Sequence, residues 1–341
     1  MRIGIAITRA SAVGLEWTTT HLIHALLKEG HSLRIIESWD FELESNGRLL
    51  ARAHAMDGPL SKEAICQRLK GHGAKRVFVE VAKLDALVVR INPLDPAVLA
   101  FAQRAFLAGI CVVNNPFHLP AVSHKSFLCT LRGVPRPPTL VTRSRSAIRH
   151  FSAACNEGVV IKPARASGGR GVVFLPRVDD RELDKALDQA RVYGDGYWVV
   201  QAYLPEAEFG EKRLLWVGGR LLGAYRRMRA PGSFLHNLKQ GATPEACELS
   251  ESDFAIEAAI SPYLKAAGVW FAGLDVIGGK LIEVNALNPG GAHFIEATGG
   301  PRLGSEIVSS LIKEILSHRS ESEDMGDSNP LTSRDKTVLN R

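Results

Sequence analysis

Residues 273–291 read GLDVIGGKLIEVNALNPGG, and this stretch decides the fold. Two short apolar runs meet at Gly278-Gly279, and a Gly-Gly pair between apolar runs predicts a β-hairpin. The side chains of Asp275, Glu283 and Asn285 all offer oxygen, the ligand atom that hard cations such as Mg²⁺ prefer. The stretch therefore predicts a hairpin that carries a magnesium site.

The sequence leaves the register of this hairpin open. A three-residue loop at 278–280 sets Asp275 directly opposite Glu283, and Asn285 then shares their face because side chains alternate along a strand. A two-residue loop turns Asp275 and Glu283 to opposite faces, since a slip of one residue flips a strand. A metal site needs the first register. The alternative interpretation is an edge hairpin whose polar side chains face water.

Composition limits the class of protein. The 341 residues are 45% hydrophobic and 23% charged, which is typical of a globular chain with two or three domains. No apolar run approaches the roughly 20 residues that span a bilayer. The net charge is +6, but the basic residues are dispersed. We therefore expect anionic small molecules as partners, with no nucleic acid and no membrane. The sequence does not decide whether the chain forms a homo-oligomer.

The cysteines and the first residues indicate the compartment. The five cysteines are scattered, with no CxxC pair, which predicts reduced thiols and no structural zinc. Residues 1–10, MRIGIAITRA, are typical of a first β-strand rather than a signal peptide. We expect a cytoplasmic protein.

Strands and helices alternate in the first third of the chain. The pattern predicts strands at 2–8, 33–36, 77–81, 87–90 and 110–113, helices at 18–28 and 96–108, and a hairpin or loop at 41–58. This alternation predicts an α/β domain with a mostly parallel, doubly wound sheet. This part of the chain lacks the glycine motifs that mark dinucleotide-binding folds and P-loop NTPases.

The pattern changes after a proline-rich run at 132–139. We expect strands at 158–162, 171–175, 198–202, 213–217 and 221–225, and helices at 123–131, 181–192, 251–267 and 306–318. From residue 319 the chain turns polar, which predicts disorder.

A second stretch, VIKPARASGGRGV at 160–172, has the chemistry of a phosphate-binding loop. Lys162 ends an apolar strand, and the loop that follows contains Gly168, Gly169 and Gly171. Glycines let backbone N–H groups approach a phosphate, and a lysine adds charge. A plain connecting turn is the alternative.

Two further stretches are compatible with a nucleotide site. The apolar strand in VVQAYLPEAE at 199–208 could offer backbone groups to a purine, although a buried strand meeting a loop explains it equally well. Arg213, Arg226, Arg227 and Arg229 could hold phosphates or carboxylates, or form a solvated basic face.

In this order the motifs resemble the ATP-grasp family, and within it the bacterial glutathione synthetases. The phrases that carry the resemblance are LVVRINPLDP, HKSF around Lys125, VIKP with GGRGV, QAYLPEA, GEKRLLWVGG and GLDVIGGKLIEVN. The resemblance covers residues 1–318. It implies an N-terminal α/β domain at 1–122 and an ATP-grasp domain at 123–318, with a lid at about 140–200 and a C-terminal subdomain at about 201–318.

The resemblance also implies roles for individual residues. Lys125 and Lys162 would contact ATP phosphates, and Gly168, Gly169 and Gly171 would form a mobile lid loop. The adenine pocket would be lined by Gln201, Ala202, Tyr203 and Leu204, with Glu211 near the ribose. Arg213 and Arg229 would act in catalysis, while Asp275, Glu283 and Asn285 would hold two Mg²⁺, with Mn²⁺ as a substitute. The substrate residues would be Asn237, Asn288, Gly290, Gly291 and His293.

The activity implied is an ATP-dependent carboxylate–amine ligase that forms an acyl phosphate and joins γ-glutamylcysteine to glycine. Two departures concern the substrate. His293 stands where the family has an arginine for a substrate carboxylate, and His236 precedes Asn237 where a second arginine is expected. Histidine can carry charge near neutral pH, so carboxylate binding stays open. The alternatives are a related ligase with another carboxylate acceptor and a nucleotide-binding regulator without turnover.

Overall fold

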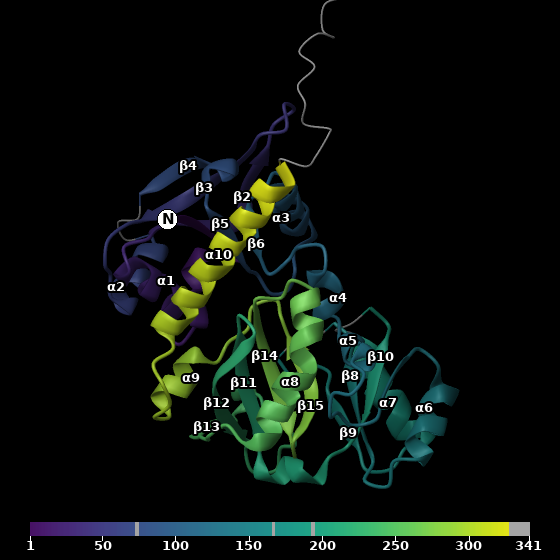
Figure 1. Cartoon of the computed structure of the whole chain (residues 1–341). Helices are drawn as coiled ribbons and strands as arrows, with labels where there is room; N and C mark the ends of the chain where they lie inside the picture. Colours follow the sequence, from purple (N-terminus) through teal and green to yellow (C-terminus); the bar gives the residue numbers. More distant parts are fainter. Residues whose placement is uncertain (72–74, 166–167, 192–194, 327–341) are drawn as a thin grey trace, which may run out of the picture.

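The computed structural model describes residues 1–71, 75–165, 168–191 and 195–326. Three sheets organise the chain, with strand orders β4-β3-β2-β1-β5-β6, β7-β10-β8-β9 and β13-β12-β11-β14-β15. Figure 1 shows the first sheet in one lobe and the other two in a second lobe. None of the helices in these described ranges combines the length and apolar character needed to cross a membrane.

The first lobe is the expected α/β domain. Its elements are β1 (Arg2–Ile7), α1 (Thr18–Lys28), β2 (Ser32–Leu43), β3 (Leu49–Met56), α2 (Lys62–Leu69), β4 (Arg76–Glu80), β5 (Ala86–Arg90), α3 (Pro96–Leu107) and β6 (Cys111–Val113). The strands β2, β1, β5 and β6 pair in parallel, whereas β3 and β4 add an antiparallel edge. The mostly parallel sheet is confirmed, and the hairpin expected at 41–58 is the β2–β3 connection.

Local chemistry explains why these elements form where they do. Every residue of β5 is buried, as expected for a parallel strand covered on both faces. Helix α3 begins after Asp95, whose carboxylate accepts from the amides of Ala97 and Val98, and Pro96 occupies its first turn. The helix predicted at 96–108 therefore agrees with the observed α3 to within one residue.

The second lobe contains the other two sheets. The second sheet and its helices comprise α4 (Leu119–Ser123), α5 (Phe127–Thr130), β7 (Thr139–Thr142), α6 (Arg145–Ala153), β8 (Val159–Pro163), β9 (Val173–Leu175), α7 (Asp180–Arg191) and β10 (Trp198–Ala202). The third comprises β11 (Glu211–Val217), β12 (Arg220–Met228), β13 (Thr243–Ala246), α8 (Glu251–Ala266), β14 (Phe271–Ile277), β15 (Lys280–Asn285), α9 (Ala292–Ala297) and α10 (Gly304–Gly326). All five strands predicted between 158 and 225 are present. The short strands β7 and β13 and the helices α6 and α9 were not predicted, although Ser144 caps α6 by accepting from the amide of Ala147 at 3.3 Å.

The prediction of a single helix at 123–131 is wrong. Two short helices, α4 and α5, stand in its place, and His124 between them has an extended backbone with ψ of 131°. The break brings the amide of Lys125 to the carbonyl of Ala164, at 3.2 Å. A tertiary hydrogen bond to the segment after β8 therefore interrupts the helix.

The closing helix is longer than expected. It runs to Gly326, so residues 319–326, expected to be disordered, are helical. The rest of that tail, 327–341, lies outside the described residues. Helix α10 packs beside α1 over the first sheet, and its buried Ile307, Leu311 and Ile315 join the core of that lobe (Figure 1). The domain boundaries inferred from the sequence stay predictions, although each sheet falls within one of the expected ranges.

Candidate active site

The β14–β15 hairpin brings the three oxygen ligands to one face. Asp275 lies directly opposite Glu283, and Gly273 lies opposite Asn285. The turn itself is the tight one, because Ile277 pairs with Lys280 across Gly278-Gly279. A β-bulge then offsets the register by one residue, so that Ile282 and Glu283 both face Asp275.

The expected facing of Asp275 and Glu283 is therefore confirmed, and of the two loops that the sequence left open the structure has the two-residue one. Gly278 and Gly279 have φ of +53° and +69°, the left-handed backbone that a two-residue hairpin turn requires. The bulge, rather than a longer loop, sets Asp275 opposite Glu283.

This face of the hairpin forms the floor of a polar pocket between the second and third sheets. Its volume is about 120 Å³. The lining residues are Lys125, Lys162, Pro163, Gly168, Gly169, Arg170, Val172, Glu211, Arg213, Arg227, Leu235, His236, Asn237, Asp275, Ile282, Glu283 and Asn285.

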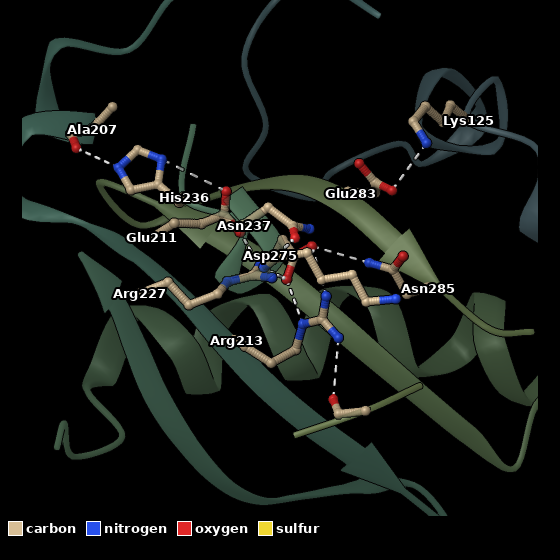
Figure 2. Close-up of polar contacts among 12 residues, drawn as sticks. Lys125, Ala207, Glu211, Arg213, Arg227, His236, Asn237, Asp275, Glu283 and Asn285 are labelled. Carbon is tan, nitrogen blue, oxygen red and sulfur yellow. Dashed lines mark hydrogen bonds and ion pairs between the residues drawn. The ribbon is translucent and has the colours of Figure 1, made fainter. Parts of the chain in front are cut away.

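Asp275 is the centre of the pocket's hydrogen-bond network. Arg213 donates to its two oxygens from Nε at 2.5 Å and from Nη2 at 3.1 Å, and Arg227 donates from Nη2 at 2.6 Å (Figure 2). Asn285 adds a bond from Nδ2 at 3.0 Å. Burial by itself would raise the pKa of Asp275, but the charges of Arg213 and Arg227 outweigh it and leave that pKa lowered. Asp275 is thus held as a carboxylate.

Glu211 enters the same network from β11. Its carboxylate pairs with Arg227, while its other oxygen lies 4.0 Å from Nδ1 of His236. Burial raises the pKa of Glu211 despite the charge of Arg227. A role near a ribose stays a prediction.

Two lysines reach the pocket from different elements. Lys125 donates from Nζ to Glu283 at 3.0 Å, apart from the Asp275 network (Figure 2). Lys162 on β8 is only 7% exposed and donates to Oε1 of Gln201 at 2.9 Å. Burial lowers the pKa of Lys162. Both lysines thus stand beside the predicted metal ligands.

The glycine-rich loop covers the pocket. Gly168 and Gly169 line it with φ of +73° and +76°, a backbone that favours glycine. A Cβ placed on Gly169 would lie 3.5 Å from Cβ of Asn237, so the loop meets the segment after β12. Gly171, with φ of +67°, is outside the lining, and residues 166–167 lie outside the described residues.

The expected adenine-binding run lies at the end of β10. Gln201 is buried against Lys162, whereas Ala202, Tyr203 and Leu204 line a separate cavity of about 600 Å³. The amides of Ala202 and Tyr203 already donate to the carbonyls of Pro138 and Gly158, both at 3.0 Å. The carbonyl of Leu204 in turn accepts from the amide of Ala207 at 3.0 Å, so the role of this run in an adenine pocket stays a prediction.

The expected substrate residues are spread over two places. Asn237 lines the pocket, and the carbonyl of Gly290 accepts from Nη1 of Arg213 at 3.1 Å. Gly291 donates from its amide to Thr18 of α1 at 3.1 Å. His293 instead packs at the first lobe, with its ring 5.6 Å from that of His21.

Asn288 has a buried Oδ1 with no hydrogen-bond partner among the residues described. Burial lowers the pKa of His293, and it also lowers that of His236, whose Nε2 donates to the carbonyl of Ala207 at 2.8 Å. Both histidines are therefore biased toward the neutral form.

The sequence grouped Arg227 with the other arginines that could hold phosphates or carboxylates, but it gave the catalytic role to Arg229. Arg229 lies beyond the end of β12 and outside the pocket lining, while Arg227 is 5% exposed and bonds Asp275. The signal was the pairing of β11 with β12, which sets Glu211 opposite Arg227. Alternation along β12 then places Tyr225 and Arg227, but not Arg226, on the pocket face.

The donor set fits Mg²⁺. In the described part of the chain, no three His, Cys, Asp or Glu side chains cluster closely enough to hold an ion by themselves. Two carboxylates and an amide oxygen on one face nevertheless suit a cation that keeps waters and substrate phosphates among its ligands.

The chain matches a known family over this region. Residues 126–300 match the model for the ATP-grasp domain of prokaryotic glutathione synthetase. The chain is 32% identical over 234 residues to the glutathione synthetase of Rhodopseudomonas palustris, covering 67% of this chain and 73% of that protein. It is 33% identical over 225 residues to that of Vibrio parahaemolyticus, covering 64% and 70%.

Solved structures share the fold at lower identity. The D-cycloserine synthetase DcsG superposes with a TM-score of 0.66 at 16% identity, covering 92% of this chain and 99% of that one. The D-alanine-D-alanine ligase of Coxiella burnetii gives 0.62 at 14% identity, covering 96% and 99%. The fold is thus that of ATP-grasp proteins, and the chain belongs to the prokaryotic glutathione synthetase family.

Proposed function

We propose that this chain is an ATP-dependent carboxylate–amine ligase that joins γ-glutamylcysteine to glycine. One observation carries the proposal: two lysines, a glycine-rich loop and an Asp/Glu/Asn oxygen set converge on one pocket from separate sheets. The name shared by its relatives, glutathione synthetase, supports the choice of substrates.

Asp275, Glu283 and Asn285 would hold two Mg²⁺, with Mn²⁺ as a substitute. When bound, such ions neutralise phosphate charge and orient the γ-phosphate. Lys125 now pairs with Glu283 and would turn its ammonium group to phosphate oxygens once the carboxylate has another partner. Lys162 and the amides of the loop at 168–169 would meet the same phosphates.

The reaction has two steps. An oxygen of the substrate carboxylate attacks the γ-phosphorus of ATP, so that ADP leaves and an acyl phosphate forms. The amine then attacks the acyl carbon, loses a proton, and inorganic phosphate leaves as the amide forms. Arg213, which bridges Asp275 and the carbonyl of Gly290, would stabilise developing oxyanion charge, and Arg227 bonds the same carboxylate.

The small pocket supports a lid role for the glycine-rich loop. A volume of about 120 Å³ is below the roughly 300–1,000 Å³ of typical ligand sites. The loop at 168–171 would therefore lift from Asn237 to admit a nucleotide and close again to protect the acyl phosphate from water.

A related ligase with another carboxylate acceptor is the second candidate. One observation favours it: His236 and His293 are biased toward the neutral form, so neither supplies the fixed charge of a carboxylate-binding arginine. In either case the partners are small molecules, with a homo-oligomer left open. We place the protein in the cytoplasm, in keeping with its five free cysteines.

The test removes the oxygen ligands. We expect Asp275→Asn and Glu283→Gln each to lower ADP release by about a hundredfold or more, because each deletes a charge that the metal needs. Glu208→Ala, an exposed carboxylate outside the pocket lining, is the matched control. Thermal unfolding of each variant confirms that it folds. Near-normal turnover in both pocket variants would contradict the metal assignment.

A further inference from the structure

The segment after the hairpin, residues 286–292, is held by the first lobe. Asn114 donates from Nδ2 to the carbonyl of Ala286 at 2.8 Å, and Arg90 donates from Nη2 to that of Pro289 at 2.9 Å. Thr18 accepts from the amides of Gly291 and Ala292. Side chains of the first lobe thus fix a segment that contains the predicted substrate residues Asn288, Gly290 and Gly291.

Arg90 is the unusual member of this set. It ends β5 and is only 4% exposed, with Nε donating to Thr19 at 3.3 Å and the guanidinium 5.1 Å from the ring of Phe271. Burial lowers the pKa of Arg90 to about 9. Within the described ranges no carboxylate pairs with it. Because an uncompensated buried charge is costly, packing alone does not explain an arginine here.

The carbonyl that Arg90 holds lies next to one that the active site uses. Arg90 binds the oxygen of Pro289, and Arg213 binds the oxygen of Gly290, one residue later. The Pro289 carbonyl belongs to the peptide plane before Gly290 and the Gly290 carbonyl to the plane after it, and the φ and ψ of Gly290 join the two planes. Arg90 holds the first plane, and Thr18 holds the second through the amide of Gly291 at 3.1 Å, so that together they fix the conformation of Gly290. Arg213 in turn points at Asp275 (Figure 2). A chain of direct contacts therefore runs from β5 to the candidate metal site.

We propose that Arg90 is a positioning residue for the ligase reaction: it fixes the Pro289–Gly290 segment so that the Gly290 carbonyl holds Arg213 against Asp275. Its role in catalysis rests on the proposed function, whereas its effect on Arg213 does not. The first lobe thereby contributes to the geometry of a site whose chemistry lies on the second lobe.

The first arm of the test observes Arg213 directly. The full chain is labelled with ¹⁵N-arginine, and the Nε–H resonance that disappears in Arg213→Lys is assigned to Arg213. In Arg90→Gln we expect this resonance to shift and its hydrogen exchange to accelerate about tenfold or more, since Gly290, whose carbonyl holds Nη1 of Arg213, is then fixed on one side only and the contact of Nε with Asp275 loosens. Arg90→Lys, which keeps a donor for Pro289, should recover part of the protection.

The matched control is Arg76→Gln, which removes another arginine of the same sheet. Arg76 pairs with Glu37 and Asp40, and among the described residues its polar contacts do not include the segment at 286–292. Its loss should lower the thermal midpoint but leave the Arg213 resonance in place.

The second arm is kinetic. We expect Arg90→Gln to lower kcat for ADP release about tenfold or more, while the KM for ATP stays within about twofold, because only the placement of Arg213 changes. An unchanged Arg213 resonance in Arg90→Gln, or the same shift in Arg76→Gln, would overturn the inference. Absence of turnover in the unmodified chain would count against the proposed function alone, since the resonance still decides the role of Arg90.

Discussion

Gly273 makes room for Arg213. A Cβ built on Gly273 would lie 2.8 Å from Nη1 of Arg213 and 3.2 Å from its Cδ and Cζ. The arginine lies across the bare backbone of β14 to reach Asp275, two residues along the same strand. A glycine in mid-strand weakens a sheet, and close approach of another group is one reason to have it there.

We predict that Gly273→Ala displaces Arg213 from Asp275 and lowers ADP release about tenfold or more, because a misplaced charge no longer stabilises the transition state. The backbone of Gly273 is not left-handed, so the change acts through the side chain. Gly14→Ala, whose Cβ would meet nothing closer than 3.4 Å, is the control. Turnover of Gly273→Ala equal to that of the control would contradict this role of Arg213.

Residue types were easier to predict than their contacts. Lys125, Lys162, Asp275, Glu283 and Asn285 all line one pocket, as their order along the chain indicated. Arg229 was preferred to Arg227 because no pattern in RRMR shows which arginine faces inward. That choice depends on where β12 pairs with β11 and where it ends, which are tertiary properties.

At the scale of elements, the β14–β15 hairpin shows why register is hard to read from sequence. The Gly-Gly turn is local and was recognised, but the bulge at Ile282 has no local signal. Ile282 and Glu283 both line the pocket, so the extra residue is accommodated by tertiary packing. That Asp275 and Glu283 lie opposite each other was predictable only because a metal site needs both carboxylates on one face of the hairpin.

Helix α9 is tied to the first lobe by Glu296. Its carboxylate lies 3.3 Å from Nδ1 of His21 and 3.6 Å from Nζ of Lys62, and it also accepts from the amide of Leu303. Burial opposes ionisation, but the hydrogen bonds from His21 and Leu303 outweigh it and lower the pKa of Glu296 to about 2. The unfolded chain has the ordinary value near 4.5.

This shift predicts a pH-dependent contribution to stability. A lowered folded-state pKa stabilises the fold fully above about 4.5, and the contribution is lost as pH falls toward about 2. Glu296→Gln should therefore lower the free energy of unfolding by up to about 3 kcal/mol near neutral pH, and by less near pH ~3.5. Urea unfolding at both pH values measures the difference.

Glu306→Gln is the control for that measurement, because Glu306 and its partner Arg220 are both largely exposed. It should change stability little at either pH. A Glu296→Gln effect that does not shrink on acidification would contradict the lowered pKa.

At the scale of the whole molecule, the site is built by two sheets and supported by the lobe of the first. The second sheet supplies Lys162 and the glycine-rich loop, and the third supplies Asp275, Glu283, Arg213 and Arg227. The first lobe supplies none of these groups, but it fixes the segment at 286–292 and packs against α10. Figure 1 shows how α10 returns the end of the chain to that lobe.

The alternation of strands and helices predicted the first lobe well, because its buried parallel strands have strong local patterns. The return of α10 to this lobe was not predictable, since an amphipathic helix shows which face is buried but not against what. The substrate end of the site was the least predictable part, because contacts between the lobes decide it.

The most direct test is ADP release by the full chain with Mg²⁺ and ATP, across a panel of carboxylate and amine pairs. We predict that γ-glutamylcysteine with glycine stimulates release most, with one amide formed per ADP, and that either substrate alone gives little. Stimulation by a different pair would move the function to a related ligase. No ADP release with any pair would contradict the assignment of this pocket to ligase chemistry.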